Sequence, residues 1–271
     1  MMPPVPEPLF SVVVVAVGLV LGSFLNVCIH RLPRGESVVH PRSRCPACGE
    51  LIRWYQNIPV FSWILLRARC ARCGCPISWR YPLVELMTAG ILLGLWITLG
   101  PSPAFVVAAP FCLAMTVLFF TDLDLQLLPD AITWPGIAVG IAVAWINPFL
   151  GQETRLAGLW MAVSGAALGA GVLWGIGALY GRLRGVEAMG LGDVKLMAMV
   201  GAFTGPLGVL FTLFAASVVG AVVGVALIPL RGRSLSDTLP FGCFLAPAAV
   251  VAMLYGRQAI GVYFDLVLGR A

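Results

Sequence analysis

The chain has 271 residues, of which 60% are hydrophobic and 11% are charged. Because about 25% of the residues in an average soluble domain are charged, this composition excludes a soluble globular protein and indicates an integral membrane protein. The formal net charge of +5 requires no nucleic-acid partner, since the basic residues concentrate on one side of the expected membrane topology.

Eight apolar runs can be read as helices that span or nearly span a bilayer, which takes about 20 residues. None alternates polar and apolar residues as a transmembrane β-strand would. The run at 194–206 is the shortest and is interrupted by glycines. The sequence therefore predicts an all-α polytopic membrane protein with about eight transmembrane helices. The expected helices cover residues 9–29, 83–100, 104–121, 131–148, 156–180, 194–206, 207–229 and 239–256.

The positions of the basic residues predict the orientation. No positive charge precedes the first apolar run and several follow it, so we expect an anchor with its N-terminus outside rather than a cleaved signal. With this orientation, 14 of the 17 Lys and Arg residues lie in segments that face the cytoplasm. Those segments are residues 30–82, 122–130, 181–195 and 229–238.

Three regions follow from this topology. They are a first transmembrane helix (1–29), a cytoplasmic loop (30–82) and a membrane core of about seven helices (83–271).

The cytoplasmic loop contains two Cys-x-x-Cys pairs, Cys45 with Cys48 and Cys70 with Cys73, separated by 21 residues. A glycine after each pair permits a tight turn. Two such pairs supply the four thiolates that a structural zinc ion prefers, with no coordination position left open. A pair of disulfides is the alternative, which a reducing cytoplasm disfavours. Cys75, two residues beyond the second pair, is expected to be a bystander, with a spare ligand as the alternative. Small packing residues are expected at Cys28, Cys112 and Cys243.

Two aspartates lie at the ends of apolar runs, Asp122 in TDLDLQLLPD and Asp193 in MGLGDVK. A carboxylate at mid-membrane costs about 2.5 kcal/mol or more, so its presence beside hydrocarbon suggests a function. The predicted topology places both at cytoplasmic helix ends, at the same membrane depth. We expect a helix to begin near Asp193, where its free N–H groups would favour an anion. Lys195 is a candidate to assist.

An ionised and a protonated carboxyl group that share one water form the catalytic pair of aspartic proteases. Helix capping is the alternative for any single aspartate, and it is the role we expect for Asp130, which follows a proline and begins a helix. For Asp122 and Asp193 together, the two signatures favour catalysis. Asp124 is expected to be solvated or near the mouth of the site.

Six stretches of the chain carry a resemblance to a known family. They are GSFLNVCIHRLP (22–33), the two cysteine pairs, NIPVFSW (57–63), ISWRYPLVEL (77–86), TDLDLQLLPD (121–130) and GLGDVKLMAMVGA (190–202). In these stretches the chain resembles the type IV prepilin peptidases, bifunctional leader peptidase/N-methyltransferases of the GxGD aspartic protease group.

The resemblance implies that Asp122 and Asp193 are the catalytic pair. It also implies that the basic leader of a type IV pilin, or of a type II secretion pseudopilin, is cut after a glycine at the cytoplasmic face of the bacterial inner membrane. Methylation of the new N-terminal amine would follow, with S-adenosylmethionine as donor. The chain departs from the family at Ala68, where glycine is common, in a region that the family associates with methyl transfer.

Nothing in the residues alone identifies a methyl-donor site. The chain has no segment of the size of a soluble nucleotide-binding domain, so any donor pocket has to be built from residues 30–82 and the adjoining membrane face.

Two other classes of function fit parts of the pattern. A polytopic transporter could use Asp122 and Asp193 to couple protons or cations. Transporters usually bury such groups near the bilayer midplane and consist of two related halves, whereas we detect no repeat in this chain. A zinc-knuckle scaffold of a secretion assembly would use its aspartates only as helix caps.

Overall fold

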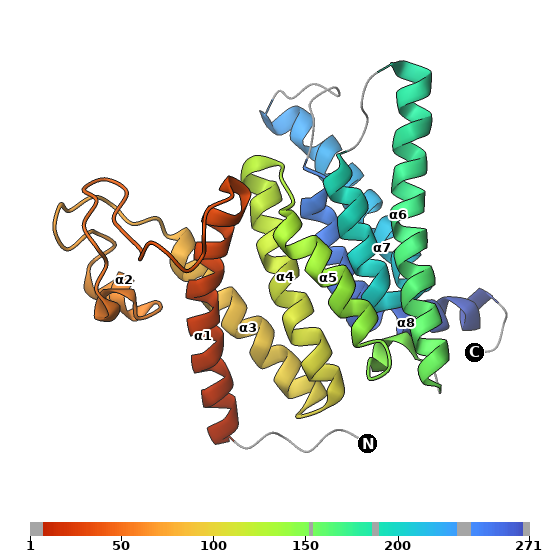
Figure 1. The fold of residues 1–271 in the computed structure, drawn as a ribbon, viewed down its shortest axis with the longest axis horizontal. Helices are drawn as coiled ribbons and strands as arrows, with labels where there is room; N and C mark the ends of the chain where they lie inside the picture. The colour runs from red at the N-terminus through yellow and green to blue at the C-terminus, as the bar shows by residue number, and fades with distance from the viewer. Residues whose placement is uncertain (1–7, 152–153, 186–189, 232–239, 268–271) are drawn as a thin grey trace. The chain divides into compact units, whose positions relative to one another are not determined.

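The computed structural model describes residues 8–151, 154–185, 190–231 and 240–267. Within these ranges the chain forms eight α-helices, three short 3-10 helices and no strand (Figure 1). The α-helices are α1 (Pro8–Arg31), α2 (Phe61–Leu65), α3 (Arg80–Leu99), α4 (Pro103–Leu125), α5 (Asp130–Ala142), α6 (Arg155–Arg184), α7 (Leu191–Arg231) and α8 (Gly242–Val267). The predicted all-α membrane fold is therefore confirmed.

Each of the eight apolar runs is helical over most of its described part, but the runs are divided differently. Six helices in the described ranges are long and apolar enough to cross a bilayer, namely α1, α3, α4, α6, α7 and α8. α7 contains two predicted runs, and its backbone breaks at Gly205 (φ 70°, ψ −177°), one residue from the predicted boundary. α5 has 13 residues. At 1.5 Å per residue it is about 20 Å long, shorter than the hydrocarbon layer of about 30 Å.

The chain divides into two compact units, residues 1–117 and 118–271. This boundary falls inside α4, whereas the division proposed from the sequence separated the loop from the core at residue 83. In the first unit α1 and α3 lie side by side. A Cβ atom at Gly22 of α1 would lie 2.5 Å from the Cα atom of Glu85 of α3, so the missing side chain lets the two backbones approach closely.

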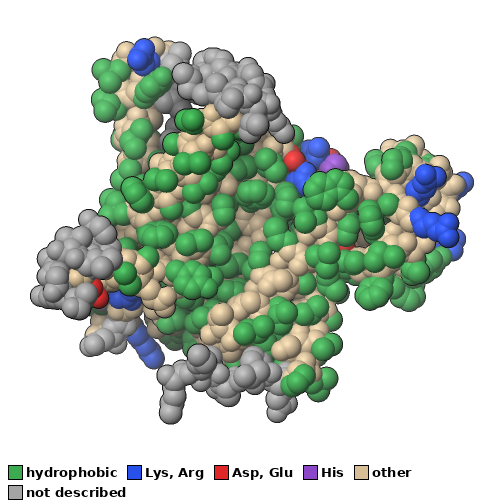
Figure 2. All heavy atoms as spheres, turned by 180° about the vertical axis from the view of Figure 1, so that it is seen from behind, with side chains coloured by type: hydrophobic (Ala, Val, Ile, Leu, Met, Phe, Trp, Pro, Cys, Tyr) green, Lys and Arg blue, Asp and Glu red, His purple; other side chains and the backbone are tan. Residues whose placement is uncertain are grey.

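In the second unit α7 packs against α5, α6 and α8. α6 and α7 cross at a pair of glycines, where a Cβ atom at Gly165 would lie 2.3 Å from the carbonyl oxygen of Gly201. Many large apolar side chains face outward, among them Phe214 and Val222 of α7. Hydrophobic side chains cover much of the face seen in Figure 2. Small residues between helices and large ones outside are what a protein surrounded by lipid needs.

The Gly165–Gly201 crossing predicts the effect of one methyl group. Gly165→Ala should lower the unfolding temperature in detergent by several degrees, because overpacking a tight interface costs about 1–3 kcal/mol. The matched control is Gly171→Ala in the same helix, where an added Cβ atom meets nothing within 4 Å. Equal unfolding temperatures for the two variants would contradict the close crossing.

Candidate active site and cysteine cluster

Asp122 lies in the last turn of α4 and is 5% exposed. Its Oδ2 atom accepts a hydrogen bond of 2.8 Å from the backbone N–H of Cys243, the second residue of α8. The first N–H groups of a helix have no partner within the helix, so they are available to a carboxylate. The start of α8 therefore supplies a hydrogen bond to a carboxyl group that apolar surroundings would otherwise leave without support.

A glycine makes this hydrogen bond possible. A Cβ atom at Gly242 would lie 2.8 Å from the Oδ2 atom of Asp122 and 2.9 Å from its Cγ atom. Cys243 is buried, as expected from the sequence, and its thiol also donates to the backbone oxygen of Phe119 at 3.4 Å. Gly242 and Cys243 thus fix the position of Asp122, a role that the sequence analysis did not assign to them.

Asp193 is the third residue of α7, which begins at Leu191, so the predicted helix start near Asp193 is confirmed. Its side chain is half-buried, and its backbone N–H donates to the oxygen of Gly190 at 3.2 Å. Asp122 lies close enough to act on Asp193 electrostatically. The fold therefore places the two aspartates within electrostatic range of each other, Asp122 at the C-terminal end of α4 and Asp193 at the N-terminal end of α7.

The buried side chain of Leu128 lies against Gly192, which precedes Asp193, and against Gly242 at the start of α8. A Cβ atom at Gly192 would lie 3.2 Å from the Cβ atom of Leu128, and one at Gly242 would lie 3.3 Å from its Cδ2 atom. Leu128 is 6% exposed. It packs the chain that follows α4 against the starts of α7 and α8, so it holds Asp122 and Asp193 on neighbouring elements. No feature of its sequence environment distinguishes it from other apolar residues.

Asp130 and Lys195 have a different role from the one expected. Asp130 does not cap α5, because the capping position is Pro129 and no side-chain cap is formed. Instead both carboxylate oxygens of Asp130 accept from the Lys195 ammonium group, at 2.7 and 2.9 Å. Lys195 therefore links α7 to the start of α5 rather than pairing with Asp193.

The two cysteine pairs form matching turns. The N–H of Gly49 donates to the oxygen of Cys45 at 2.9 Å, and that of Gly74 donates to the oxygen of Cys70 at 3.0 Å. Both glycines have a left-handed backbone, with φ of 72° and 71°. Glycine adopts this conformation without steric cost, which explains its place after each pair.

The four sulfur atoms meet in a single cluster. The Sγ atoms of Cys45, Cys48, Cys70 and Cys73 lie within 4.8 Å of one another and could hold a metal ion. The Sγ atoms of Cys45 and Cys73 are 3.8 Å apart. A zinc ion bound tetrahedrally at about 2.3 Å would need sulfur atoms about 3.8 Å apart. The backbone N–H groups of Cys73 and Arg72 lower the pKa of the Cys70 thiol to about 6, whereas burial and the neighbouring thiols raise the pKa of Cys73 to about 12.

Ala68, which stands where glycine is common, has φ of 58°. This left-handed conformation costs an L-residue roughly 1–2 kcal/mol. The backbone of Ala68 is held on both sides. Its N–H donates to the backbone oxygen of Trp63 at 2.8 Å, and its own oxygen accepts from the backbone N–H of Ile77 at 2.7 Å. The geometry gives a physical reason for glycine at this position.

Two family models match the chain. The bacterial peptidase A24 N-terminal domain matches residues 16–99, and the type IV leader peptidase family matches residues 109–225. No solved structure was found to match the chain.

Curated relatives agree with these matches, and each of the three described below is named prepilin leader peptidase/N-methyltransferase. The protein of Myxococcus xanthus is 42% identical over 84% of this chain and 66% of its own length. That of Aeromonas hydrophila is 38% identical over 88% of each chain, and that of Pseudomonas putida is 36% identical over 93% of each chain. This multi-pass membrane protein therefore belongs to the type IV leader peptidase family and is a peptidase.

Proposed function

We propose that the protein is an aspartic endopeptidase that removes the basic leader of type IV prepilins or type II secretion pseudopilins. Cleavage occurs after a glycine at the cytoplasmic face of the bacterial inner membrane. The observation that carries the proposal is the placement of Asp122 and Asp193 within electrostatic range of each other, at the ends of α4 and α7. The names of the relatives and the concentration of Lys and Arg in the predicted cytoplasmic segments support the substrate class and the orientation.

The two carboxyl groups hold one proton between them and share one water molecule. The ionised group takes a proton from the water, while the protonated group donates a hydrogen bond to the scissile carbonyl oxygen. The water oxygen then bonds to the carbonyl carbon. As the carbon–nitrogen bond breaks, the departing amine takes up a proton, and the leader leaves with a new carboxylate.

The position of the pair at helix ends suits this substrate. A peptide bond inside a helix resists hydrolysis, because its carbonyl is engaged in the helical hydrogen bonds. At the boundary between an extended leader and an apolar helix the chain can be cut without unwinding the helix. A pair at the membrane surface meets that boundary, whereas a proton or cation pathway would place its carboxylates near the midplane.

A second reaction completes the proposal. The new N-terminal amine is methylated with S-adenosylmethionine as donor, in keeping with the N-methyltransferase part of the relatives' names. The four-cysteine cluster binds a structural zinc ion, because its four thiolates and its sulfur spacing match tetrahedral coordination.

Removing either carboxylate should stop cleavage. We expect Asp122→Asn and Asp193→Asn each to lower the rate of leader removal from a purified prepilin by about 10⁴-fold or more, because the two groups act as a unit. The matched control is Asp124→Asn, which removes an exposed carboxylate from the same helix as Asp122 and should keep kcat close to the original value. Cleavage at the original rate by either catalytic variant would refute the pair.

The hydrogen bond from α8 should matter for the rate of cleavage rather than for substrate binding. In Gly242→Ala the added Cβ atom displaces the Asp122 carboxyl, and a displacement of about 1 Å can lower kcat by about 100-fold. Gly261→Ala in the same helix adds a Cβ atom that meets nothing within 4 Å, so it should cleave normally. If the two alanine variants have the same kcat, the contact between α8 and Asp122 does not position the carboxyl.

The cysteine cluster should hold about one zinc ion per chain, measured by elemental analysis of the purified protein. Replacing Cys45 and Cys48 together by serine should remove the metal, because two thiolates alone do not complete a tetrahedral site. Cys75→Ser is the control, since Cys75 lies outside the cluster and should not affect metal content. A metal-free parent protein with an intact loop would exclude the zinc site.

A further inference from the structure

A cavity of about 830 Å³ lies in the first unit, between the C-terminal end of α1, the cysteine loop and the start of α3. We call it the loop cavity. Its volume is within the range of about 300–1,000 Å³ that small-molecule sites occupy. Ser23, Asn26, Tyr81 and Glu85 line it from the two helices, while Cys45, Cys70 and several arginines line it from the loop. The sequence predicts that any donor pocket is built from residues 30–82 and the adjoining membrane face, which is where this cavity lies.

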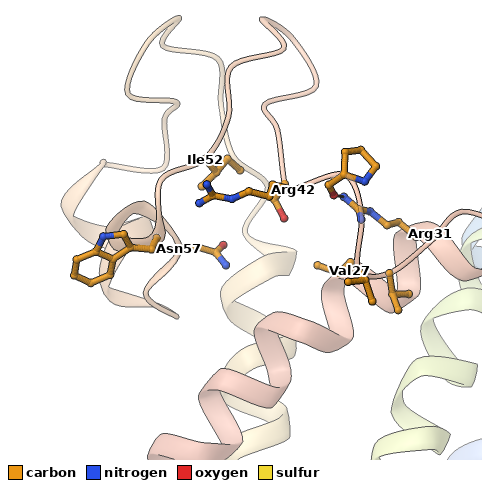
Figure 3. A pocket seen from close by; sticks show the side chains of 10 residues that line it. Val27, Arg31, Arg42, Ile52 and Asn57 are labelled. Atoms are coloured by element: carbon orange, nitrogen blue, oxygen red, sulfur yellow. Dashed lines mark hydrogen bonds between the residues drawn. The ribbon is translucent and has the colours of Figure 1, made fainter.

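A smaller pocket of about 220 Å³ adjoins the loop cavity. Figure 3 shows Val27 and Arg31 of α1 on one side of this pocket and Arg42, Ile52 and Asn57 of the loop on the other. Of these five residues, all but Arg42 line both spaces. The guanidinium of Arg31 donates to the backbone oxygens of two loop residues at 2.8 Å, so it fixes the loop at this wall.

Glu85 is the buried carboxylate of the loop cavity, with 7% of the residue exposed. Its Oε2 atom accepts a hydrogen bond of 2.8 Å from the backbone N–H of Val60, and the side chain of Ser23 also bonds to it. Val60 has φ of 62° and ψ of −51°, an unfavourable conformation for a β-branched residue. Such strain persists only where the surroundings impose it, and it is concentrated at functional sites.

The charges that line the cavity are unevenly placed. Its lining contains two carboxylates, Glu50 and Glu85, and four arginines, Arg31, Arg44, Arg53 and Arg72. Glu50 lies in the loop and is neutralised by Arg72, whereas the partners of Glu85 named above are uncharged. A cationic group that entered the cavity would therefore find its negative partner at Glu85, on the helical wall.

The amine released by leader cleavage is such a group. A peptide α-amine has a pKa of about 7.7–8.0, so at neutral pH most of it is protonated and cannot attack a methyl group. A reaction that methylates it needs a nearby acceptor for one proton and space for the donor. The loop cavity offers both.

We propose that, in the loop cavity, Glu85 binds the new N-terminal amine and accepts its proton before the methyl group is transferred. This inference rests on the proposed methylation. The deprotonated nitrogen forms a bond to the methyl carbon of the donor's sulfonium group. The carbon–sulfur bond breaks, and its electron pair stays on the sulfur, which becomes a neutral thioether. The proton removed from the amine stays on Glu85 until solvent takes it.

The first test separates the two reactions in one sample. Glu85→Gln keeps an oxygen that can accept from Val60 but removes the charge. With a purified prepilin, mass spectrometry should show leader removal close to the original rate and a methylation rate lower by about 100-fold or more, as for loss of a general base. Glu85→Asp, which restores the carboxylate on a shorter side chain, should recover part of the methylation.

The second test measures binding without turnover. Ala71, between the cysteines of the second pair, lines the loop cavity, whereas Ala47, between the cysteines of the first pair, is not among its lining residues. In the full-length protein in detergent, Ala71→Phe should weaken the binding of S-adenosylhomocysteine, the demethylated donor, by about tenfold or more, measured by calorimetry. Ala47→Phe should bind as tightly as the parent protein. Elemental analysis should show the same zinc content in both.

Two kinds of result would overturn the inference, and they are distinguishable. If the parent protein methylates its product and Glu85→Gln does so at the same rate, Glu85 is not the acceptor. Equal S-adenosylhomocysteine binding by the two phenylalanine variants would place the donor outside the cavity. If the parent protein neither methylates nor binds S-adenosylhomocysteine, the proposed methylation fails with the inference, while leader cleavage is unaffected.

Discussion

Hydrogen-bond donors for carboxyl groups in an apolar protein are scarce, and the arrangement of the second unit depends on how they are supplied. Asp122 is buried at the end of α4 and obtains its donor from the backbone of α8, through the N–H of Cys243. That contact requires Gly242, since any side chain there would collide with the carboxyl group. Asp193 sits in the first turn of α7, where free N–H groups favour a negative charge. The N-terminal ends of α7 and α8 therefore support the two carboxyl groups, because these are the ends at which a helix has unpaired backbone donors.

The two units suit the two reactions of the proposed function. The second unit holds the aspartates and has buried contacts through Leu128, Gly192 and Gly242. The first unit combines the cysteine cluster with a cavity whose wall includes Cys45 and Cys70. A zinc ion in that cluster would stiffen one wall of the cavity without taking part in chemistry, because four thiolates leave no open position. The metal would then keep the methyl-transfer site in its shape.

The hydrophobic runs predicted nearly all of the helices, and even the break in α7 falls one residue from the expected boundary, because glycine interrupts the run there. The spacing of the four cysteines likewise predicted their meeting, since each turn is a local structure.

The partners of Asp122 could not be predicted. Every residue except proline has a backbone N–H, so no residue type marks this donor in the sequence. In addition, Cys243 follows Asp122 by 121 residues. Similar long-range pairing decided the role of Lys195, which binds Asp130 and not its near neighbour Asp193. The contact of Glu85 with Val60 depends on a loop conformation that no propensity favours.

In the proposed reaction, two carboxyl groups from separate helices act on one scissile bond. The most direct measurement is an experimental structure of the full chain with a leader peptide whose scissile amide is reduced and cannot be cut. We expect the carbon that replaces the scissile carbonyl to lie between Asp122 and Asp193, with a carboxyl oxygen of each in van der Waals contact with it or one bridging water away. A peptide bound with that carbon beyond the reach of either aspartate would contradict it.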